Sequence, residues 1–319
     1  MTRLASIAAA SFGELVRLPV YLAVLSGGVA FITVLANLSY FEFGEEARLV
    51  KQSVMAFILV GGLFTAAFGA AASISREIRL GTALAVLSKP VGRVSFLLGK
   101  FAGLAGALGL QVAVHLLAAL LASRFAFDTY GSPDWRGTLL VFAALIFGLL
   151  VAGASNFIAH RSFHRDAVLA TSLSTLVVFL AINCFSRDWI WQPFGSGLDW
   201  RLVPVGVLVF FALLVLASIA VMCSTRLEAV PTLVVCTGIF LAGLLSDYVF
   251  GRAAADGSMI AGCLHALIPN WQIFWVADAL NQTGVIPSSY LLKAVAYVVG
   301  QLMLILSLGL LLFSKRELN

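Results

Sequence analysis

The charged side chains of this sequence that could bind a partner gather in one segment, Ser75–Lys100, which reads SREIRLGTALAVLSKPVGRVSFLLGK. Long apolar runs flank it on both sides, so a polar insert of this length must lie in water at one face of a membrane. Its first part, Arg76–Leu87, has an apolar stripe at i, i+3, i+4 and i+7, which predicts an amphipathic helix. We expect the segment to contact a partner through Arg76, Glu77, Arg79, Gly81, Thr82, Leu84, Leu87, Pro90 and Arg93.

A second set of polar residues lies inside the apolar runs. Gln111 and His115 are one helical turn apart in one run, and Asn156 lies near the end of another. These side chains could line a substrate path. They could instead form hydrogen bonds between neighbouring membrane helices, which is the interpretation we favour.

The sequence contains no complete motif for catalysis, ATP binding or metal binding, because each near-match has the wrong spacing or the wrong residue type. His160 and His164 stand four residues apart beside Asp166, but we expect them to be solvated anchors of a short turn and not metal ligands. The pair Gly99-Lys100 lacks the spacing and the Ser or Thr of a phosphate-binding loop. The sequence also contains neither HExxH nor GxSxG. It therefore predicts no enzyme, no metal and no cofactor in this chain.

The composition identifies an integral membrane protein. Of 319 residues, 61% are hydrophobic and only 11% are charged, whereas about a quarter of the residues in a soluble domain are charged. No segment is long enough for a separate soluble domain, so we expect one membrane domain, 1–319, folded as an all-α bundle. Apolar runs of about 20 residues predict eight spans: Pro19–Leu38, Ser53–Ile74, Phe96–Leu121, Thr138–Ile158, Ala167–Cys184, Val203–Cys223, Pro231–Phe250 and Lys293–Phe313.

The distribution of Lys and Arg predicts that both termini lie on the inner side of the cytoplasmic membrane. With the N-terminus inside, the inner segments hold 12 of the 20 basic residues and only 5 of the 15 acidic ones. Within the spans only Lys100, Asp247 and Lys293 are charged, each near a span end from which it can reach water. The lack of a mid-membrane carboxylate disfavours a carrier driven by protons or ions.

Three flanking features complete the predicted organisation. Residues 1–18 read as a short amphipathic helix on the inner leaflet. The longest outer loop, 251–292, contains two short amphipathic pieces separated by Pro269, which we expect at the outer membrane interface. The third span has small residues that predict close packing against a neighbouring helix: Gly99, Gly103, Gly106 and Gly109.

With the charged insert on the inner side, Ser75–Lys100 resembles the segment between the second and third spans of the ABC type-2 permease family. The family pattern runs E-x-x-x-G-T, then hydrophobic residues, then P-x-x-R and L-L-G-K. The N-terminal surface helix and the terminal Arg316-Glu317-Leu318 also look like this family. The residues that match the pattern are Glu77, Gly81, Thr82, Leu87, Pro90, Arg93 and Leu97-Leu98-Gly99-Lys100.

The resemblance implies the membrane subunit of an ATP-binding-cassette transporter, usually an exporter. Such subunits pair as homodimers or heterodimers and work with separate ATPase subunits, which bind ATP and Mg²⁺ and dock on a coupling helix, here within residues 75–95. The usual family core has six spans, which leaves Thr138–Cys184 as an extra hairpin. The alternative is a membrane scaffold or assembly factor of the same fold, which would bind a partner through the same segment without moving a substrate.

Overall fold

The computed structural model describes residues 3–38, 46–79, 92–125, 134–276 and 286–315. Its regular elements within these ranges are all helices. Six of the helices are long and apolar enough to cross a membrane, or up to eight spans result if each of two bent helix pairs counts as one. This confirms the predicted all-α, polytopic membrane fold, and each of the eight predicted spans corresponds to one of these helices or pairs.

The helices that could each cross a membrane alone are α3 (Glu46–Ala70) with its continuation to Arg79, α6 (Arg93–Phe125), α7 (Trp135–Ala159), α8 (Phe163–Ile182), α9 (Leu202–Ser224) and α13 (Ser288–Ser314). One bent pair is α1 (Arg3–Leu15) with α2 (Pro19–Leu35), at 69°. The other is α10 (Ala229–Leu244) with η2 (Asp247–Gly251) and α11 (Arg252–Ala255), at 49°.

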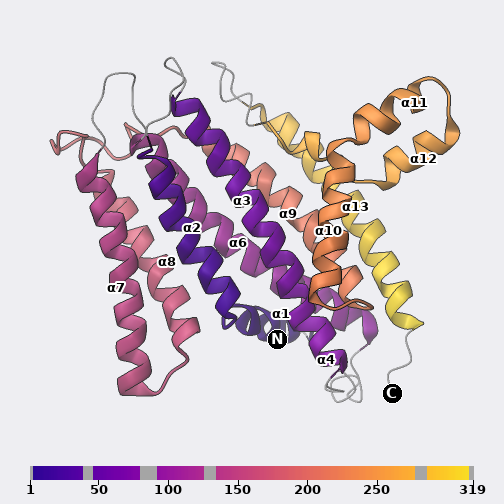
Figure 1. Ribbon diagram of the computed structural model, residues 1–319, viewed down its shortest axis with the longest axis horizontal. Coiled ribbons are helices and arrows are strands. Elements are labelled where there is room, and N and C mark those ends of the chain that lie inside the picture. Colours follow the sequence, from indigo (N-terminus) through magenta and orange to yellow (C-terminus); the bar gives the residue numbers. More distant parts are fainter. Residues whose placement is uncertain (1–2, 39–45, 80–91, 126–133, 277–285, 316–319) are drawn as a thin grey trace.

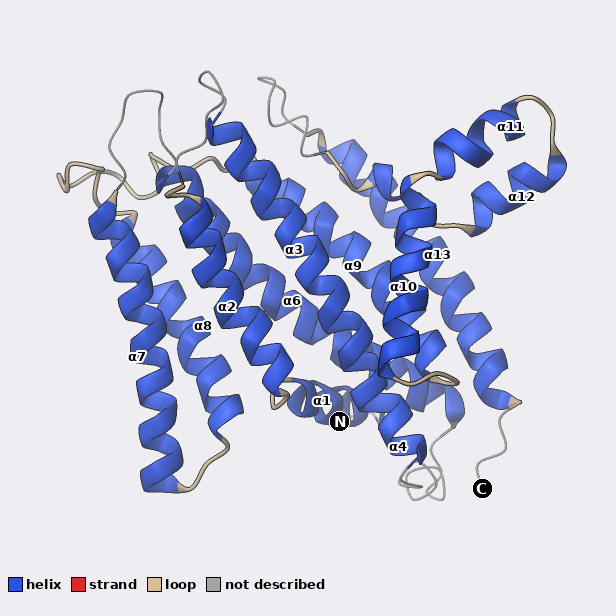
Figure 2. Cartoon of the chain, in the orientation of Figure 1, coloured by secondary structure: helices blue, strands red, loops and turns tan. Residues whose placement is uncertain are grey.

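The helices form a bundle with a buried centre and exposed flanks. Helices α2, α3, α6 and α9 occupy the middle, α7 and α8 lie on one side, and α10 to α13 lie on the other (Figure 1). Helices α3 and α9 are mostly buried, whereas α7, α8 and α13 leave most of their apolar residues exposed, as expected for helices that face lipid. We call the end that carries α1, α4 (Arg76–Arg79) and the α7–α8 turn the basal end, and the opposite end the distal end (Figures 1 and 2).

Helix α1 lies across the basal end and packs on the glycine face of α6. The chain turns at Leu18, and Pro19 begins α2, since proline suits the first position of a helix. A Cβ atom added at Gly103 would lie 2.5 Å from Cβ of Ser11 and 2.7 Å from the carbonyl oxygen of Ala8. Only glycine permits so close an approach of the two backbones. The predicted small-residue contact is therefore present, and its partner is α1.

The second span does not end before the charged segment. Helix α3 continues through a π-helical turn, η1 (Ala71–Ser75), directly into α4. The apolar stripe of Arg76–Leu87 predicts a separate amphipathic helix, but residues 70–75 include no proline or glycine, so the backbone hydrogen bonds continue from α3 into α4. Residues 80–91, with the predicted contact positions Gly81, Thr82, Leu84, Leu87 and Pro90, lie outside the described residues, as does the terminal Arg316-Glu317-Leu318.

The long loop before α13 contains the short helical pieces that the sequence predicts. Helix α12 (Met259–Leu267) precedes Pro269, and η3 (Trp271–Ile273) follows it. Trp271 is buried and lies against Phe240 of α10, with ring centroids 5.7 Å apart. The part of the loop after Pro269 thus packs on the bundle, whereas α11 and α12 extend away from it (Figure 1). The placement of the loop at an outer membrane interface stays a prediction.

Candidate functional site

Three charged side chains from three helices meet at the basal end. The Lys100 ammonium of α6 lies 2.7 Å from the Glu77 carboxylate of α4 and 3.2 Å from the Glu14 carboxylate of α1. The exposed fraction of the side chain rises from 5% for Lys100 to 20% for Glu77 and 51% for Glu14. We call these three residues the basal ion cluster. It joins the start of the charged segment to both α6 and the N-terminal helix.

The expectation that Lys100 would reach out to water is wrong. Its ammonium group is buried beneath α1 and α4, and it lies 5.8 Å from the ring centroid of Phe96. A buried charge is costly unless it is paired and hydrogen-bonded. The two carboxylates supply that pairing, so they replace the water that a lysine at a span end would otherwise seek.

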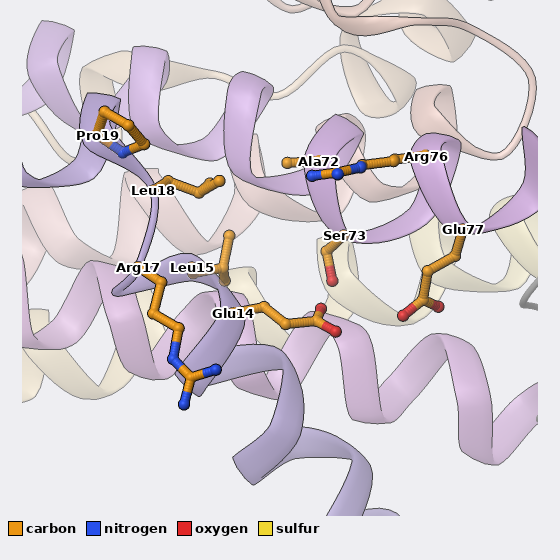
Figure 3. A pocket seen from close by; sticks show the side chains of 9 residues that line it. All are labelled: Glu14, Leu15, Arg17, Leu18, Pro19, Ala72, Ser73, Arg76 and Glu77. Atoms are coloured by element: carbon orange, nitrogen blue, oxygen red, sulfur yellow. The ribbon is translucent and has the colours of Figure 1, made fainter. Parts of the chain in front are cut away.

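A cavity of about 580 Å³ opens beside the basal ion cluster. Figure 3 shows the carboxylates of Glu14 and Glu77 directed toward each other across it, with the Ser73 hydroxyl beside them and the Arg76 side chain extending along one wall. The hydroxyl groups of Ser73, in the π-helical turn, and Ser11, in α1, also form a hydrogen bond of 3.0 Å. π-helical turns are rare and occur frequently at functional sites.

The described ends of the charged segment contact two further elements. Arg79 forms an ion pair of 2.8 Å with Glu228 in the turn between α9 and α10, and both side chains are more than half exposed. Arg93 donates a hydrogen bond of 2.5 Å to the carbonyl oxygen of Ser314 at the end of α13. Cations are favourable at a helix C-terminus because the last carbonyl groups carry partial negative charge. The segment is therefore tied to α1, α6, α13 and the α9–α10 turn.

The three residues that could line a substrate path lie in two places, Gln111 and His115 in the core and Asn156 on the surface. Gln111 and His115 are fully buried in the core. Thr65 of α3 donates a hydrogen bond of 2.7 Å to the Gln111 side-chain oxygen, and a ring nitrogen of His115 lies 3.1 Å from the Leu25 carbonyl oxygen of α2. These contacts are the interhelical hydrogen bonds of the favoured interpretation.

Asn156, the third residue proposed for the path, is exposed near the basal end of α7. Its side chain donates a hydrogen bond of 2.6 Å to the Arg161 carbonyl oxygen in the following turn. In the described part of the chain no three His, Cys, Asp or Glu side chains are grouped so that they could hold a metal ion. The contacts of Gln111 and His115 therefore link helices, and the contact of Asn156 is local to the α7–α8 turn.

Sequence reasoning missed Arg124, which lies just beyond the predicted third span, Phe96–Leu121. Its guanidinium group is buried at the distal end of α6, 3.3 Å from the Asp134 carboxylate. It also donates hydrogen bonds to the carbonyl oxygens of Ile182, the last residue of α8, and of Phe185 (2.7 Å) and Ser186 (3.0 Å), which follow α8. We call this group the distal clamp. A single arginine at the end of a long apolar run, with an aspartate ten residues later, was the only signal for it.

A second distal ion group lies in the loop before α9. The Asp199 carboxylate is 2.5 Å from the Lys51 ammonium and 2.8 Å from the Arg201 guanidinium. Burial alone would raise the pKa of Asp199, but the hydrogen bonds and charges of Arg201 and Lys51 outweigh it and lower that pKa to about 2. The same pairing raises the pKa of Arg201.

Comparison with known proteins gives one family. The model of the ABC-2 family transporter protein matches residues 27–187, just over half of the 319 residues. The match includes the charged segment Ser75–Lys100 and both helices of the Thr138–Cys184 hairpin, so it does not set that hairpin apart from the rest. No curated protein matches the chain.

Proposed function

The chain belongs to the ABC-2 family of transporter proteins and is a membrane subunit of an ATP-binding-cassette transporter; from this premise we propose that a separate ATPase subunit drives it by docking on residues 75–95. The basal end then faces the cytoplasm, and the chain lies in the cytoplasmic membrane. It works as an exporter together with a second permease subunit, either another copy or a related chain. ATP and Mg²⁺ bind in the ATPase subunit.

The observation that carries this proposal is the set of contacts made by the two described ends of the charged segment. Before residue 80 the segment is fixed by the ion pair of Glu77 with Lys100 and of Arg79 with Glu228. After residue 91 it is fixed by the hydrogen bond from Arg93 to α13. A force applied to the intervening residues would therefore reach four parts of the bundle.

The strengths of these contacts suit a part that changes position. The Arg79–Glu228 pair is exposed, and exposed ion pairs are worth only about 0–1 kcal/mol. The Lys100–Glu14 contact can also be exchanged for water, because half of the Glu14 side chain is exposed. Docking can thus break and remake them at low cost, while the buried Lys100–Glu77 contact keeps α4 attached to α6.

Charge reversal at Arg79 tests the docking role. We expect Arg79→Glu to reduce co-purification of the ATPase and to abolish ATP-dependent substrate movement, because the reversed charge faces the partner. The double variant Arg79→Glu/Glu228→Lys restores the intramolecular pair but keeps the reversed charge at position 79, so we expect it to remain defective. Arg136→Glu, an exposed arginine at the distal end, is the matched control and should behave as wild type.

Two results would contradict the proposal. Recovery of the double variant would mean that Arg79 acts only through Glu228. A transport defect in Arg79→Glu with normal ATPase association would also remove the docking role. The scaffold alternative makes a different prediction, namely that the partner binds but that ATP moves no substrate in vesicles containing the complete complex.

A further inference from the structure

A second cavity lies at the basal end, where the corner between α1 and α2 meets the turn between α7 and α8. Its volume is about 310 Å³, and it is lined by Arg17, Arg161, Ser162, Arg165 and Asp166. Arg17 comes from the corner before α2, and the other four residues come from the turn and the first residues of α8. The cavity therefore lies between two parts of the chain that are more than 140 residues apart.

The lining has a surplus of positive charge. The lining residues carry three guanidinium groups and one carboxylate, and that carboxylate already accepts a hydrogen bond of 2.5 Å from the Ser155 hydroxyl. None of the three arginines forms an ion pair with an acidic residue of the described chain. The Ser162 side chain makes no capping hydrogen bond to α8, so its hydroxyl is also available. The cavity thus offers several donors to a ligand with negative charge.

Phosphate is the group that this donor set fits. The planar guanidinium group presents paired N–H donors that match two phosphate oxygens, and such charge-assisted hydrogen bonds are stronger than neutral ones. A net surplus of two positive charges favours a phosphate diester or monoester over a zwitterion. The cavity volume is at the lower end of the roughly 300–1,000 Å³ that is usual for small-molecule sites.

The surroundings of the cavity indicate where the phosphate comes from. Val20, three residues after Arg17, is 43% exposed, and Phe157 and Ile158 at the basal end of α7 are 85% and 77% exposed. These apolar side chains belong to helices that cross the membrane, so they offer a surface to acyl chains beside the arginines. Basic pockets at the ends of membrane helices are suited to anionic lipid headgroups.

We propose that Arg17, Arg161 and Arg165 bind the phosphate of an anionic phospholipid and thereby join the α7–α8 hairpin to the α1–α2 corner. The bound lipid links the hairpin, which otherwise packs on the bundle through α2 and α6, to the helix that carries Glu14. This site goes beyond the proposed docking function and does not depend on it.

Lipid titration of the detergent-solubilised full chain, followed by native mass spectrometry, tests the site. We expect phosphatidylglycerol to bind more tightly than phosphatidylcholine. The double variant Arg161→Gln/Arg165→Gln should bind phosphatidylglycerol about tenfold more weakly or worse, because each lost charge-assisted hydrogen bond contributes strongly. The matched control, Arg3→Gln/Lys315→Gln, removes the same charge near the same end but away from the cavity, and should bind as wild type.

Single and conservative variants keep the test decisive if the double variant does not fold. Arg17→Gln changes the same cavity from another element and should weaken phosphatidylglycerol binding several-fold. Arg161→Lys/Arg165→Lys keeps the charge but loses the paired donors, so its affinity should be intermediate. Size-exclusion profiles of all the variants verify their folding.

Three results would overturn the lipid site. An equal loss of phosphatidylglycerol affinity in the Arg3→Gln/Lys315→Gln control would mean that any positive charge at the basal end supports binding. Equal binding of phosphatidylglycerol and phosphatidylcholine would remove the anionic headgroup as the ligand. Displacement of phosphatidylglycerol by inorganic phosphate at equal concentration would assign the cavity to a soluble phosphate.

Discussion

Helix α6 carries a buried cation near each end, and the two cations are held in different ways. At the basal end, Lys100 is paired with two carboxylates that come from two different helices. At the distal end, Arg124 is surrounded by three backbone carbonyl groups and one carboxylate. The outermost acid of the basal ion cluster, Glu14, is half exposed, whereas the side chains of the distal clamp are 2% and 3% exposed.

The spacing of the two cations explains why both are paired. They lie 24 residues apart, which corresponds to about 36 Å along a helix at 1.5 Å per residue. The hydrocarbon core of a membrane is about 30 Å thick, so both charges are placed close to its edges. At these positions a charge can reach water or a protein partner, and in this chain both cations have protein partners.

The difference indicates which end of α6 is fixed and which can rearrange. Backbone carbonyl groups cannot move away from Arg124 without unfolding the turn after α8, and Asp134 caps α7 by accepting a hydrogen bond from the Gly137 backbone. Glu14 and Glu77 are single side chains on two different helices, so each can turn away from Lys100 without unfolding of the backbone. The distal clamp is therefore a structural anchor, and the basal ion cluster is a contact that a docking partner can alter.

Removal of the distal cation should have the largest effect on stability. Arg124→Ala leaves Asp134 buried without its partner, and loss of one member of a buried pair costs about 3–5 kcal/mol. We expect a large fall in the free energy of unfolding, measured by denaturant titration in detergent, and low expression. Arg136→Ala, at an exposed arginine in the second position of α7, is the control and should be close to neutral. A wild-type unfolding curve for Arg124→Ala would show that the clamp is not an anchor.

Removal of the basal cation, Lys100, should lower the stability less than removal of Arg124 does, but it should impair ATP-dependent substrate movement more. Lys100→Met leaves carboxylates that are partly hydrated, so we expect a loss of about 1–3 kcal/mol in the free energy of unfolding. Adding Glu77→Gln should recover part of that loss, because no uncompensated charge then remains in the buried position. Coupling to ATP, measured as substrate movement in vesicles with the ATPase, should stay defective in both variants.

The two variants also distinguish a coupling contact from a merely structural one. If the double variant Lys100→Met/Glu77→Gln regains both stability and ATP-dependent transport, the basal ion cluster only holds the helices together. In that case both ends of α6 have a structural role, and the basal ion cluster differs from the distal clamp only in how exposed its side chains are.

Composition and local pattern were enough to predict the helices. Apolar runs located the six helices that could span a membrane and the two bent pairs, the Leu18–Pro19 step located the corner between α1 and α2, and Pro269 separated the two helical pieces of the long loop. The glycine positions of α6 predicted a close helix contact, though not its partner. These features depend on residues that are near one another in sequence.

The full ion groups could not be predicted, because each has at least one member that is distant in sequence from the others. Lys100 is 23 residues from Glu77 and 86 from Glu14. Arg124 binds carbonyl groups 58 to 62 residues away, and a carbonyl group carries no sequence signal at all. The position of the charged segment and its family resemblance could therefore be predicted from the sequence, whereas the partners of Lys100 follow only from the packing of α1 and α4 on α6.

The smallest expected effect concerns the stability of the distal end at low pH. It tests whether that stability depends on the distal clamp alone or also on the ion group of Asp199, Lys51 and Arg201. The pKa of Asp199 falls from an ordinary value of 3.8 to about 2, so its carboxylate stabilises the fold above about pH 4, and this contribution is lost as the pH falls toward 2. We expect wild type to be more stable than Asp199→Asn at about pH 6, and the difference in unfolding midpoint to shrink as the pH approaches 2. A difference that stays constant over this range would mean that the Lys51 and Arg201 contacts do not depend on the charge of Asp199. A difference that shrinks would show that the distal end combines the distal clamp with a second ion group, that of Asp199, whose contribution to stability depends on the pH.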